Sequence, residues 1–342
     1  MTRAAQQFVT LDALRGVAAI GVMAFHAPGN TVLQMPGGFL AVDLFFMMSG
    51  FILAQAYRSR LAEGLSSREF LWRRAIRLWP MLAVGALLGI VLHGGHAGSL
   101  LLLPDPRGSN LFPANPPLWS LLFETLAYIA FVLGLWRLRP LALAAVVGVS
   151  GATLVWMTIT QAPLADIGPH WQTVGGGFAR IGYGFAGGML AWHLWAKRSA
   201  PPRRSWLGWL PLAGMAAISA GIAPDDGPLV LFALFAGCPV ILWAALRWDL
   251  PQPRVARGLG DLSYPLYCIH VPLIAWMLAS GWHVAAIFVA LPVAALALHR
   301  AVDIPVRRWL GRVVVERIRP SRSTLPTSAQ DEQELGKGLG IG

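Results

Sequence analysis

The chain consists mostly of long apolar stretches separated by short polar turns. A helix needs roughly 20 apolar residues to cross the hydrocarbon core of a bilayer, so stretches of about 17–22 residues predict membrane-spanning helices. Ten such stretches lie at residues 10–28, 38–57, 75–93, 117–136, 139–158, 177–196, 206–223, 228–246, 261–280 and 283–301. The pattern predicts an all-α integral membrane protein with about ten transmembrane helices.

The distribution of positive charge supports this count, because Lys and Arg gather in cytoplasmic turns. With a cytoplasmic N-terminus, 24 of the 27 Lys and Arg fall in segments assigned to the cytoplasm. Arg107 alone falls in an outside loop, and Arg15 and Arg180 lie at membrane depth. We therefore expect both termini in the cytoplasm.

Composition agrees with a membrane protein, since the 342 residues are 56% hydrophobic and only 13% charged. The net charge of +11 follows the orientation rule and does not indicate a nucleic-acid partner. Cys238 and Cys268 fall inside apolar stretches, so we expect neither a disulfide nor a metal site. Residues 1–316 are expected to form one transmembrane domain and 317–342 a polar, disordered cytoplasmic tail. The Pro- and Gly-containing loop 94–116 suits a re-entrant or lid segment.

Three ionisable residues, Asp12, Arg15 and His26, interrupt the first apolar stretch. At about 100° per residue, Arg15 and His26 lie some 20° apart around the helix and roughly 16 Å apart along it, and Asp12 shares their face. Ionisable groups at membrane depth usually face a cavity or a substrate path. The alternative is an Asp12–Arg15 ion pair with His26 merely at the interface.

The fourth and ninth stretches carry polar stripes of their own. Ser120, Glu124 and Tyr128 are spaced four apart, and Glu124 has no cation on its own helix, so His26 is its expected partner. The alternative is a protonated Glu124 bonded to a backbone carbonyl. In "LSYPLYCIHVPL", His270 lies about two turns beyond Ser263, between prolines that can kink the helix, and a packing role is as plausible as a catalytic one.

The approach to the third stretch, "FLWRRAIRLWP", contains Arg73, Arg74 and Arg77. Cytoplasmic topology alone accounts for positive charge there. Because the planar guanidinium binds phosphate in a bidentate manner, a phosphorylated cytoplasmic ligand is the second interpretation.

The order and spacing of these motifs over about residues 8–312 resemble the membrane-bound acyltransferase 3 family, which transfers acyl groups, often acetyl, to bacterial surface glycans and related acceptors. The features that carry the resemblance are Arg15 with His26, "GGFLAVDLFFMMSGF", the arginine cluster ending in Pro80, Ser120-Glu124-Tyr128 and "LSYPLYCIHVP". The chain departs from the family at Ala41, where glycine is common, and at "VDIP" (302–305), where Glu, a basic residue and Pro are usual.

The resemblance implies a multi-pass protein of the bacterial inner membrane that uses acyl-CoA as donor substrate, holds no permanent cofactor and acylates a glycan or lipid-linked sugar. It also implies that the arginine cluster binds the donor phosphates and that His26 is the general base, oriented by Glu124. Arg15 would hold the donor or stabilise developing negative charge. The other polar groups expected to bind substrate are Asp12, Asp43, Ser49, Arg73, Arg74, Arg77, Ser120, Tyr128, Arg180, Tyr267 and His270.

A proton-coupled transporter or glycan exporter is the alternative function, with Asp12, Arg15, His26, Glu124 and His270 forming a proton relay. An inverted repeat between the two halves would favour transport, and none is evident by eye in the sequence. The oligomeric state, the acyl chain length and the choice between direct transfer and an acyl-enzyme intermediate stay open.

Overall fold

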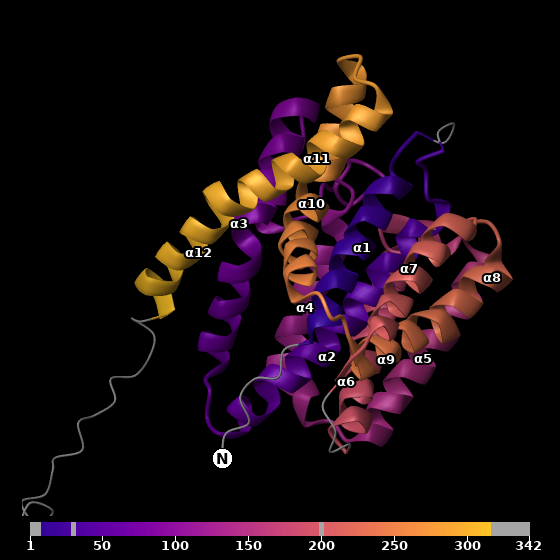
Figure 1. Ribbon diagram of the computed structural model, residues 1–342, viewed down its shortest axis with the longest axis vertical. Helices are drawn as coiled ribbons and strands as arrows, with labels where there is room; N and C mark the ends of the chain where they lie inside the picture. Colours follow the sequence, from indigo (N-terminus) through magenta and orange to yellow (C-terminus); the bar gives the residue numbers. More distant parts are fainter. Residues whose placement is uncertain (1–7, 29–31, 198–201, 316–342) are drawn as a thin grey trace, which may run out of the picture.

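Ten helical rods form the described part of the chain, residues 8–28, 32–197 and 202–315, in a computed structural model (Figure 1). The α-helices are α1 (Val9–Phe25), α2 (Ala41–Ala62), α3 (Ser67–His93), α4 (Leu118–Leu133), α5 (Pro140–Thr160), α6 (Val174–Ala196), α7 (Leu210–Gly221), α8 (Gly227–Phe232), α9 (Cys238–Arg247), α10 (Pro253–Ala279), α11 (Val284–Leu298) and α12 (Ile304–Leu310). Short π-helical turns join α8 to α9 (Ala233–Gly237) and α11 to α12 (His299–Asp303) into single rods, and a third (Gly311–Val315) extends the last rod.

Short 3₁₀ helices occupy Pro36–Leu40, Ala97–Leu101, Leu135–Arg137, Leu164–Asp166, Trp171–Thr173 and Trp206–Trp209. The strands β1 (Arg203–Arg204) and β2 (Trp248–Asp249) pair in parallel at the end of the bundle where α1 begins. The hydroxyl of Thr10 donates to the carbonyl of Trp248 at 2.8 Å and so fixes this end of α1.

Each predicted apolar stretch overlaps one of the ten rods, although several bounds differ. α3 and α10 begin eight residues before the predicted 75 and 261, and the last rod continues to Val315. The predicted tail, 317–342, lies outside the described residues.

The helices confirm the all-α membrane class. Six in the described chain are long and apolar enough to cross a membrane: Pro36–Ala62, Ser67–His93, Pro140–Thr160, Gly227–Arg247, Pro253–Ala279 and Val284–Val314. Leu118–Leu133 and Trp206–Gly221 are shorter apolar helices. The predicted number of ten crossings and the orientation of the termini stay predictions.

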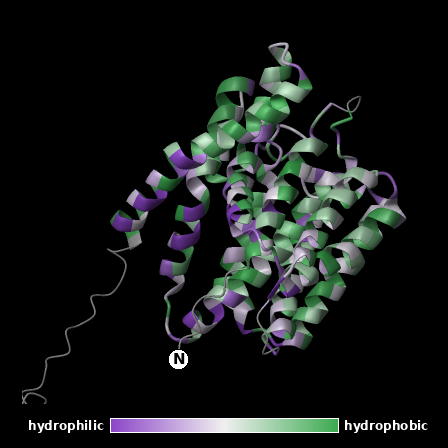
Figure 2. Ribbon diagram, viewed as in Figure 1, coloured by the Kyte–Doolittle hydropathy of each residue, from purple (hydrophilic) through white to green (hydrophobic). Residues whose placement is uncertain are grey.

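Helices α2 and α6 form the centre of the bundle together with α1 and α10. Close packing of α2 on α6 requires glycine, since a Cβ at Gly50 would collide with the carbonyl of Phe185. In the apolar window of Pro36–Ala62, 89% is buried, against 22% in Pro140–Thr160 and 17% in Val284–Val314. The last two therefore present apolar side chains outward, as lipid-facing helices do, whereas hydrophilic residues gather on α12 and the adjoining half of α3 (Figure 2).

The segment between α3 and α4 caps one end of the bundle. It contains a short 3₁₀ helix and a loop, joined to residues 162–173 by a bridge between Asn110 and His170. Asn115 donates to the carbonyl of Cys268 at 2.9 Å, which Pro272 leaves without its usual helical donor. This loop therefore binds α10 where its proline interrupts the helix.

Candidate active site

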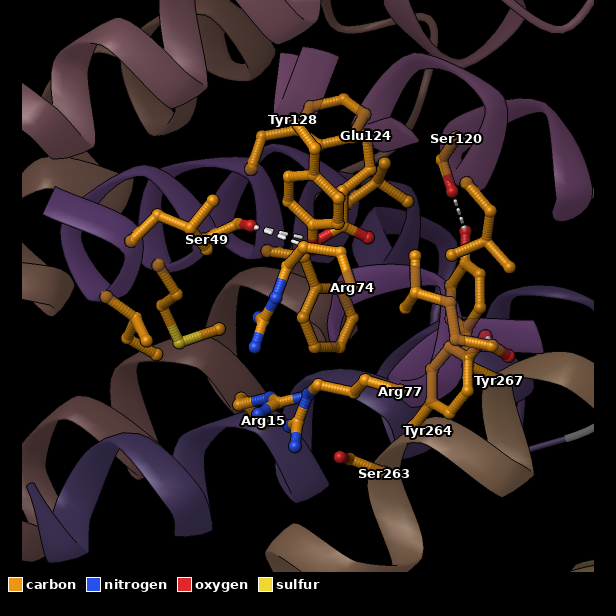
Figure 3. Close-up of a pocket in the computed structure, with 18 of the residues that line it drawn as sticks. Arg15, Ser49, Arg74, Arg77, Ser120, Glu124, Tyr128, Ser263, Tyr264 and Tyr267 are labelled. Carbon is orange, nitrogen blue, oxygen red and sulfur yellow. Dashed lines mark hydrogen bonds between the residues drawn. The ribbon is translucent and has the colours of Figure 1, made fainter. Parts of the chain in front are cut away.

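A cavity of about 340 Å³ lies between α1, α2, α3, α4 and α10 (Figure 3). We call it the arginine cavity, because Arg15, Arg74 and Arg77 extend into it. The other polar residues that line it are Asp12, Ser49, Tyr57, Ser120, Glu124, Tyr128, Ser263, Tyr264 and Tyr267. Polar residues from all three predicted stripes thus meet at one cavity, but His26 and His270 do not line it.

None of the three arginines forms an ion pair with a carboxylate in the described chain. The Asp12–Arg15 pair of the alternative interpretation is therefore not formed there. Arg74 donates to the hydroxyl of Tyr57 at 3.0 Å, and its buried Nε has no partner among the described residues. Guanidinium groups that form no ion pair and line one cavity can bind an anion in a bidentate manner, which makes this cavity a candidate anion site.

Arg73 does not line this cavity with Arg74 and Arg77, and its expected binding of substrate stays a prediction. Its guanidinium bonds Glu69, one turn earlier on α3, with Nε and Nη2 at 2.9 and 2.5 Å from the same carboxylate oxygen. Glu69 is held at the start of α3, where its backbone N–H donates to the capping hydroxyl of Ser66 at 3.1 Å. The i, i+4 ion pair turns Arg73 away from the cavity that Arg77 enters.

Glu124 likewise has different partners from the expected one. Its Oε1 accepts from Ser49 Oγ at 2.9 Å and from Tyr128 OH at 2.5 Å (Figure 3). No hydrogen bond or ion pair joins Glu124 to His26 within the described chain, and the two residues line different cavities. The predicted Glu124–His26 pair was wrong because a helical wheel fixes the face of a residue but not the relative depth of two helices.

His26 lines a second cavity of about 220 Å³, which we call the histidine cavity. It lies at the opposite end of α1 from Asp12, beneath the loop that carries Asn110 and the segment that carries Asp166 and His170. The imidazole of His170 is 3.6 Å from the carboxylate of Asp166. Trp119, Phe25 and Phe39 add an aromatic surface to the lining of this cavity.

His26 is paired with His270 of α10 instead of with Glu124. The Nδ1 of His26 is 3.2 Å from the Nε2 of His270 and 2.9 Å from the carbonyl of Val22. His270 itself is fully buried, and its Nδ1 lies against the carbonyls of Tyr267 and Leu266. The two histidines thus form one hydrogen-bonded unit at the end of α1.

Val42 and Tyr267 line both cavities and therefore form the wall between them. The hydroxyl of Tyr267 is 2.6 Å from Ser120 Oγ, and it also donates to the carbonyl of Pro117 at 3.3 Å. Its ring packs edge-on against Phe45 at 5.8 Å between centroids. The side chains of Val42 and Tyr267, the latter held at its hydroxyl, thus separate the arginine cavity from the histidine cavity.

Asp43 and Arg180, both expected to bind substrate, bind each other. Two hydrogen bonds of 2.9 and 2.6 Å join them, and both side chains are almost completely buried. Arg180 also donates to the carbonyls of Leu164 and Ile167 and lies over the ring of Trp119. The pair connects α2 and α6 to the segment beside the histidine cavity, which Arg180 itself lines. Substrate binding by either residue stays a prediction.

Several lining residues were not singled out from the sequence: Tyr57, Asn110, Asp166, His170 and Tyr264. Tyr264 stood inside a quoted motif, and its hydroxyl donates to the carbonyl of Leu78 at 2.6 Å. The others lie in loops or at a helix end, where no periodic pattern marks them. Cys238 and Cys268 are free and buried, and no cluster of three metal-ligating side chains occurs among the residues described.

Sequence comparison shows which known proteins this chain is similar to. The exopolysaccharide production protein ExoZ of Rhizobium meliloti (strain 1021) is 28% identical over 333 residues, 88% of this chain and 97% of that protein. Protein 2 in the picA locus of Rhizobium radiobacter is 40% identical over 84 residues, 24% of this chain and 44% of that protein. The peptidoglycan O-acetyltransferase OatA of Listeria monocytogenes serovar 1/2a is 28% identical over 196 residues, 48% of this chain and 31% of that protein.

The chain thus spans less than half of the last two relatives. No solved structure matches the sequence significantly. The model of the acyltransferase domain family matches residues 8–299, a range that includes all the lining residues of both cavities. The chain therefore belongs to the acyltransferase domain family.

Proposed function

We propose that the protein transfers an acyl group, acetyl by family resemblance, from cytoplasmic acyl-CoA to a hydroxyl of a glycan or lipid-linked sugar. The proposal rests on one observation above all: an arginine-rich cavity and a histidine-lined cavity meet at Val42 and Tyr267. In the proposed topology ten helices cross a bacterial inner membrane, both termini are cytoplasmic, and the arginine cavity opens toward the cytoplasm.

The arginine cavity is the proposed donor site. The donor's phosphates would bind Arg15, Arg74 and Arg77, whose guanidinium groups lack carboxylate partners in the described chain. The thioester arm would extend toward Tyr267 along a wall where Glu124 fixes the hydroxyls of Ser49 and Tyr128. The positive charge of this cavity suits an anionic donor.

The histidine cavity is the proposed acceptor site. A sugar offers hydroxyl groups to polar side chains and an apolar ring face to aromatic ones, and this cavity combines His26, Asn110 and Asp166 with Trp119. The names of two relatives refer to an exopolysaccharide and to peptidoglycan, which supports a glycan acceptor.

His26 would act as the general base. Its Nε2 accepts the proton of the acceptor hydroxyl while that oxygen attacks the thioester carbonyl. The carbon–sulfur bond then breaks, and the departing thiolate takes the proton from His26, which leaves an ester and free thiol. Because Tyr267 lies between the cavities, its side chain must move before the acceptor oxygen can reach the thioester carbonyl. The hydroxyls of Tyr267 and Ser120 lie at this junction and could donate to the developing oxyanion.

The test is acyl transfer by purified protein in proteoliposomes, with acetyl-CoA labelled in the acetyl group and a glycan extract from the source cell. Label should enter glycan with wild type and not with His26→Ala. His283→Asn is the matched control, because His283 is exposed, lies outside both cavities and caps α11 in a way that asparagine can replace. It should transfer label like wild type.

Two results would contradict the proposal. Transfer by His26→Ala at the wild-type rate would remove His26 as the base. Absence of label transfer with several donors and acceptors, together with solute or proton movement across the vesicle, would support the transporter interpretation instead.

A further inference from the structure

We propose that His270 is a positioning residue that sets the tautomer of His26. It accepts the Nδ1–H of His26 on its own Nε2, which leaves the Nε2 of His26 unprotonated and free to act as the base. The inference rests on the proposed function in that it takes His26 to be that base. It assigns the second histidine a role in proton transfer and not in packing alone.

The tautomer of His270 follows from its surroundings. Its Nδ1 lies 2.9 Å from the carbonyl oxygen of Tyr267 and 3.1 Å from that of Leu266. A carbonyl oxygen can only accept a hydrogen bond, so Nδ1 must carry the hydrogen. In a neutral imidazole the other nitrogen, Nε2, is then an acceptor. His270 therefore presents a lone pair to whatever faces its Nε2.

The group that faces it is the Nδ1 of His26, at 3.2 Å. The same Nδ1 is 2.9 Å from the carbonyl oxygen of Val22, again a pure acceptor. Two acceptors thus surround the Nδ1 of His26, and only an N–H at that position satisfies both. The opposite tautomer would place a lone pair against a carbonyl oxygen and against the lone pair of His270.

The consequence lies on the other side of the ring. With Nδ1 protonated, the neutral His26 has its lone pair on Nε2, and no described residue forms a hydrogen bond to that nitrogen. His26 lines the histidine cavity, where Nε2 is the nitrogen left to accept an acceptor-hydroxyl proton. After it takes that proton, the N–H of the imidazolium still points to Val22 O and His270 Nε2, so no side chain has to reorient.

Burial makes this arrangement rigid. His270 has 0% of its surface exposed, so water does not compete for its nitrogens. It is anchored to its own helix through Nδ1, while its ring lies 5.0 Å from that of His26 between centroids. A side chain that served packing alone would not require an acceptor at the position of Nε2.

The experiment compares two substitutions of nearly identical chemistry. His270→Gln can place an amide oxygen close to the position of Nε2, whereas His270→Asn is one methylene shorter and its amide reaches only the position of Nδ1. We expect Gln to keep most of kcat and Asn to lower kcat by roughly 10²-fold or more, with the KM for acyl-CoA unchanged in both, because general-base catalysis contributes on this scale. Equal kcat values for Asn and wild type would overturn the proposal.

A spectroscopic measurement tests the tautomer independently of activity. In ¹⁵N-histidine-labelled wild-type protein in lipid nanodiscs, the resonances that disappear in His26→Gln should report a protonated Nδ1 and an unprotonated Nε2. In His270→Asn the same resonances should show a mixture of tautomers. A protonated Nε2 in neutral wild-type His26 would overturn the inference. If wild type transferred no acyl group, the proposed function would fail, and this measurement would still decide whether His270 sets the tautomer.

Discussion

Two arginines one turn apart on α3 provide a sharp test of the donor site. Arg77 lines the arginine cavity and has no ion-pair partner in the described chain, whereas Arg73 bonds Glu69 and points away. Charge, helix and side-chain length are the same in both. If the arginine cavity binds the phosphates of acyl-CoA, Arg77→Ala should impair donor binding and Arg73→Ala should not.

The expected size follows from the contacts available. A hydrogen bond between charged groups contributes about 1.5–3 kcal/mol, and about 1.4 kcal/mol corresponds to a factor of ten, so Arg77→Ala should raise the KM for acyl-CoA roughly ten- to a hundredfold. The ion pair of Arg73 with Glu69 is an i, i+4 pair worth about 0.3–0.5 kcal/mol of stability. Arg73→Ala should therefore change the donor KM by less than about twofold.

Steady-state acyl transfer in proteoliposomes at varied acyl-CoA concentration measures both values. A second donor, acyl-pantetheine without phosphates, isolates the phosphate contribution. Wild type and Arg77→Ala should have the same KM for this truncated donor. The assay thus separates loss of a phosphate contact from general damage to the cavity.

Two results would refute the reasoning. One is an unchanged acyl-CoA KM in Arg77→Ala, which would leave the arginine cavity without a role in donor binding. The other is an equal rise in KM for both donors, which would show that Arg77 shapes the cavity without contacting phosphate.

Three further predictions concern stability. Asp43→Asn removes one charge of a buried ion pair and should lower the free energy of unfolding by about 3–5 kcal/mol, measured by denaturant titration in detergent. Hydrogen bonds from Arg107 lower the pKa of Asp105 to about 2, below the usual carboxyl pKa of about 3.9. The ionised carboxylate therefore stabilises the loop above about pH 3.9, and this contribution is lost as the pH falls through about 2. Pepsin should cleave the wild-type loop faster as the pH falls through this range, and Asp105→Asn should not show that increase. Gly50→Leu should abolish accumulation of folded protein, and wild-type yield on size-exclusion chromatography would contradict the close α2–α6 packing.

The sequence predicts the helices well because the backbone polar groups of a helix bond one another, so its side chains can be apolar over a long continuous stretch, which leaves a strong local pattern. It also predicts which face of α4 is polar, since Ser120, Glu124 and Tyr128 recur at the helical period. All three do line the arginine cavity. These are properties of single helices.

Partners between helices could not be predicted in the same way. His26 and Glu124 were expected to pair because both were placed several residues into the membrane, yet Tyr267 of α10 lies at the wall between their cavities. The relative shift and rotation of two helices depend on side-chain packing along their full length, which no local pattern encodes. The pairing of His26 with His270, 244 positions away in the sequence, likewise depends on how α1 packs against α10.

The structure also divides the charged residues of the helices into two kinds that look alike in the sequence. Asp43 and Arg180 neutralise each other in a fully buried pair, although Arg180 also lines the histidine cavity. Arg15 and Arg77 face a cavity and have no carboxylate partner in the described residues. Arg15 is half-buried and Arg77 exposed, and guanidinium groups that form no ion pair stay free to bind an anion in a bidentate manner. The missing ion-pair partner, more than the presence of charge, is what makes the arginine cavity a candidate substrate site.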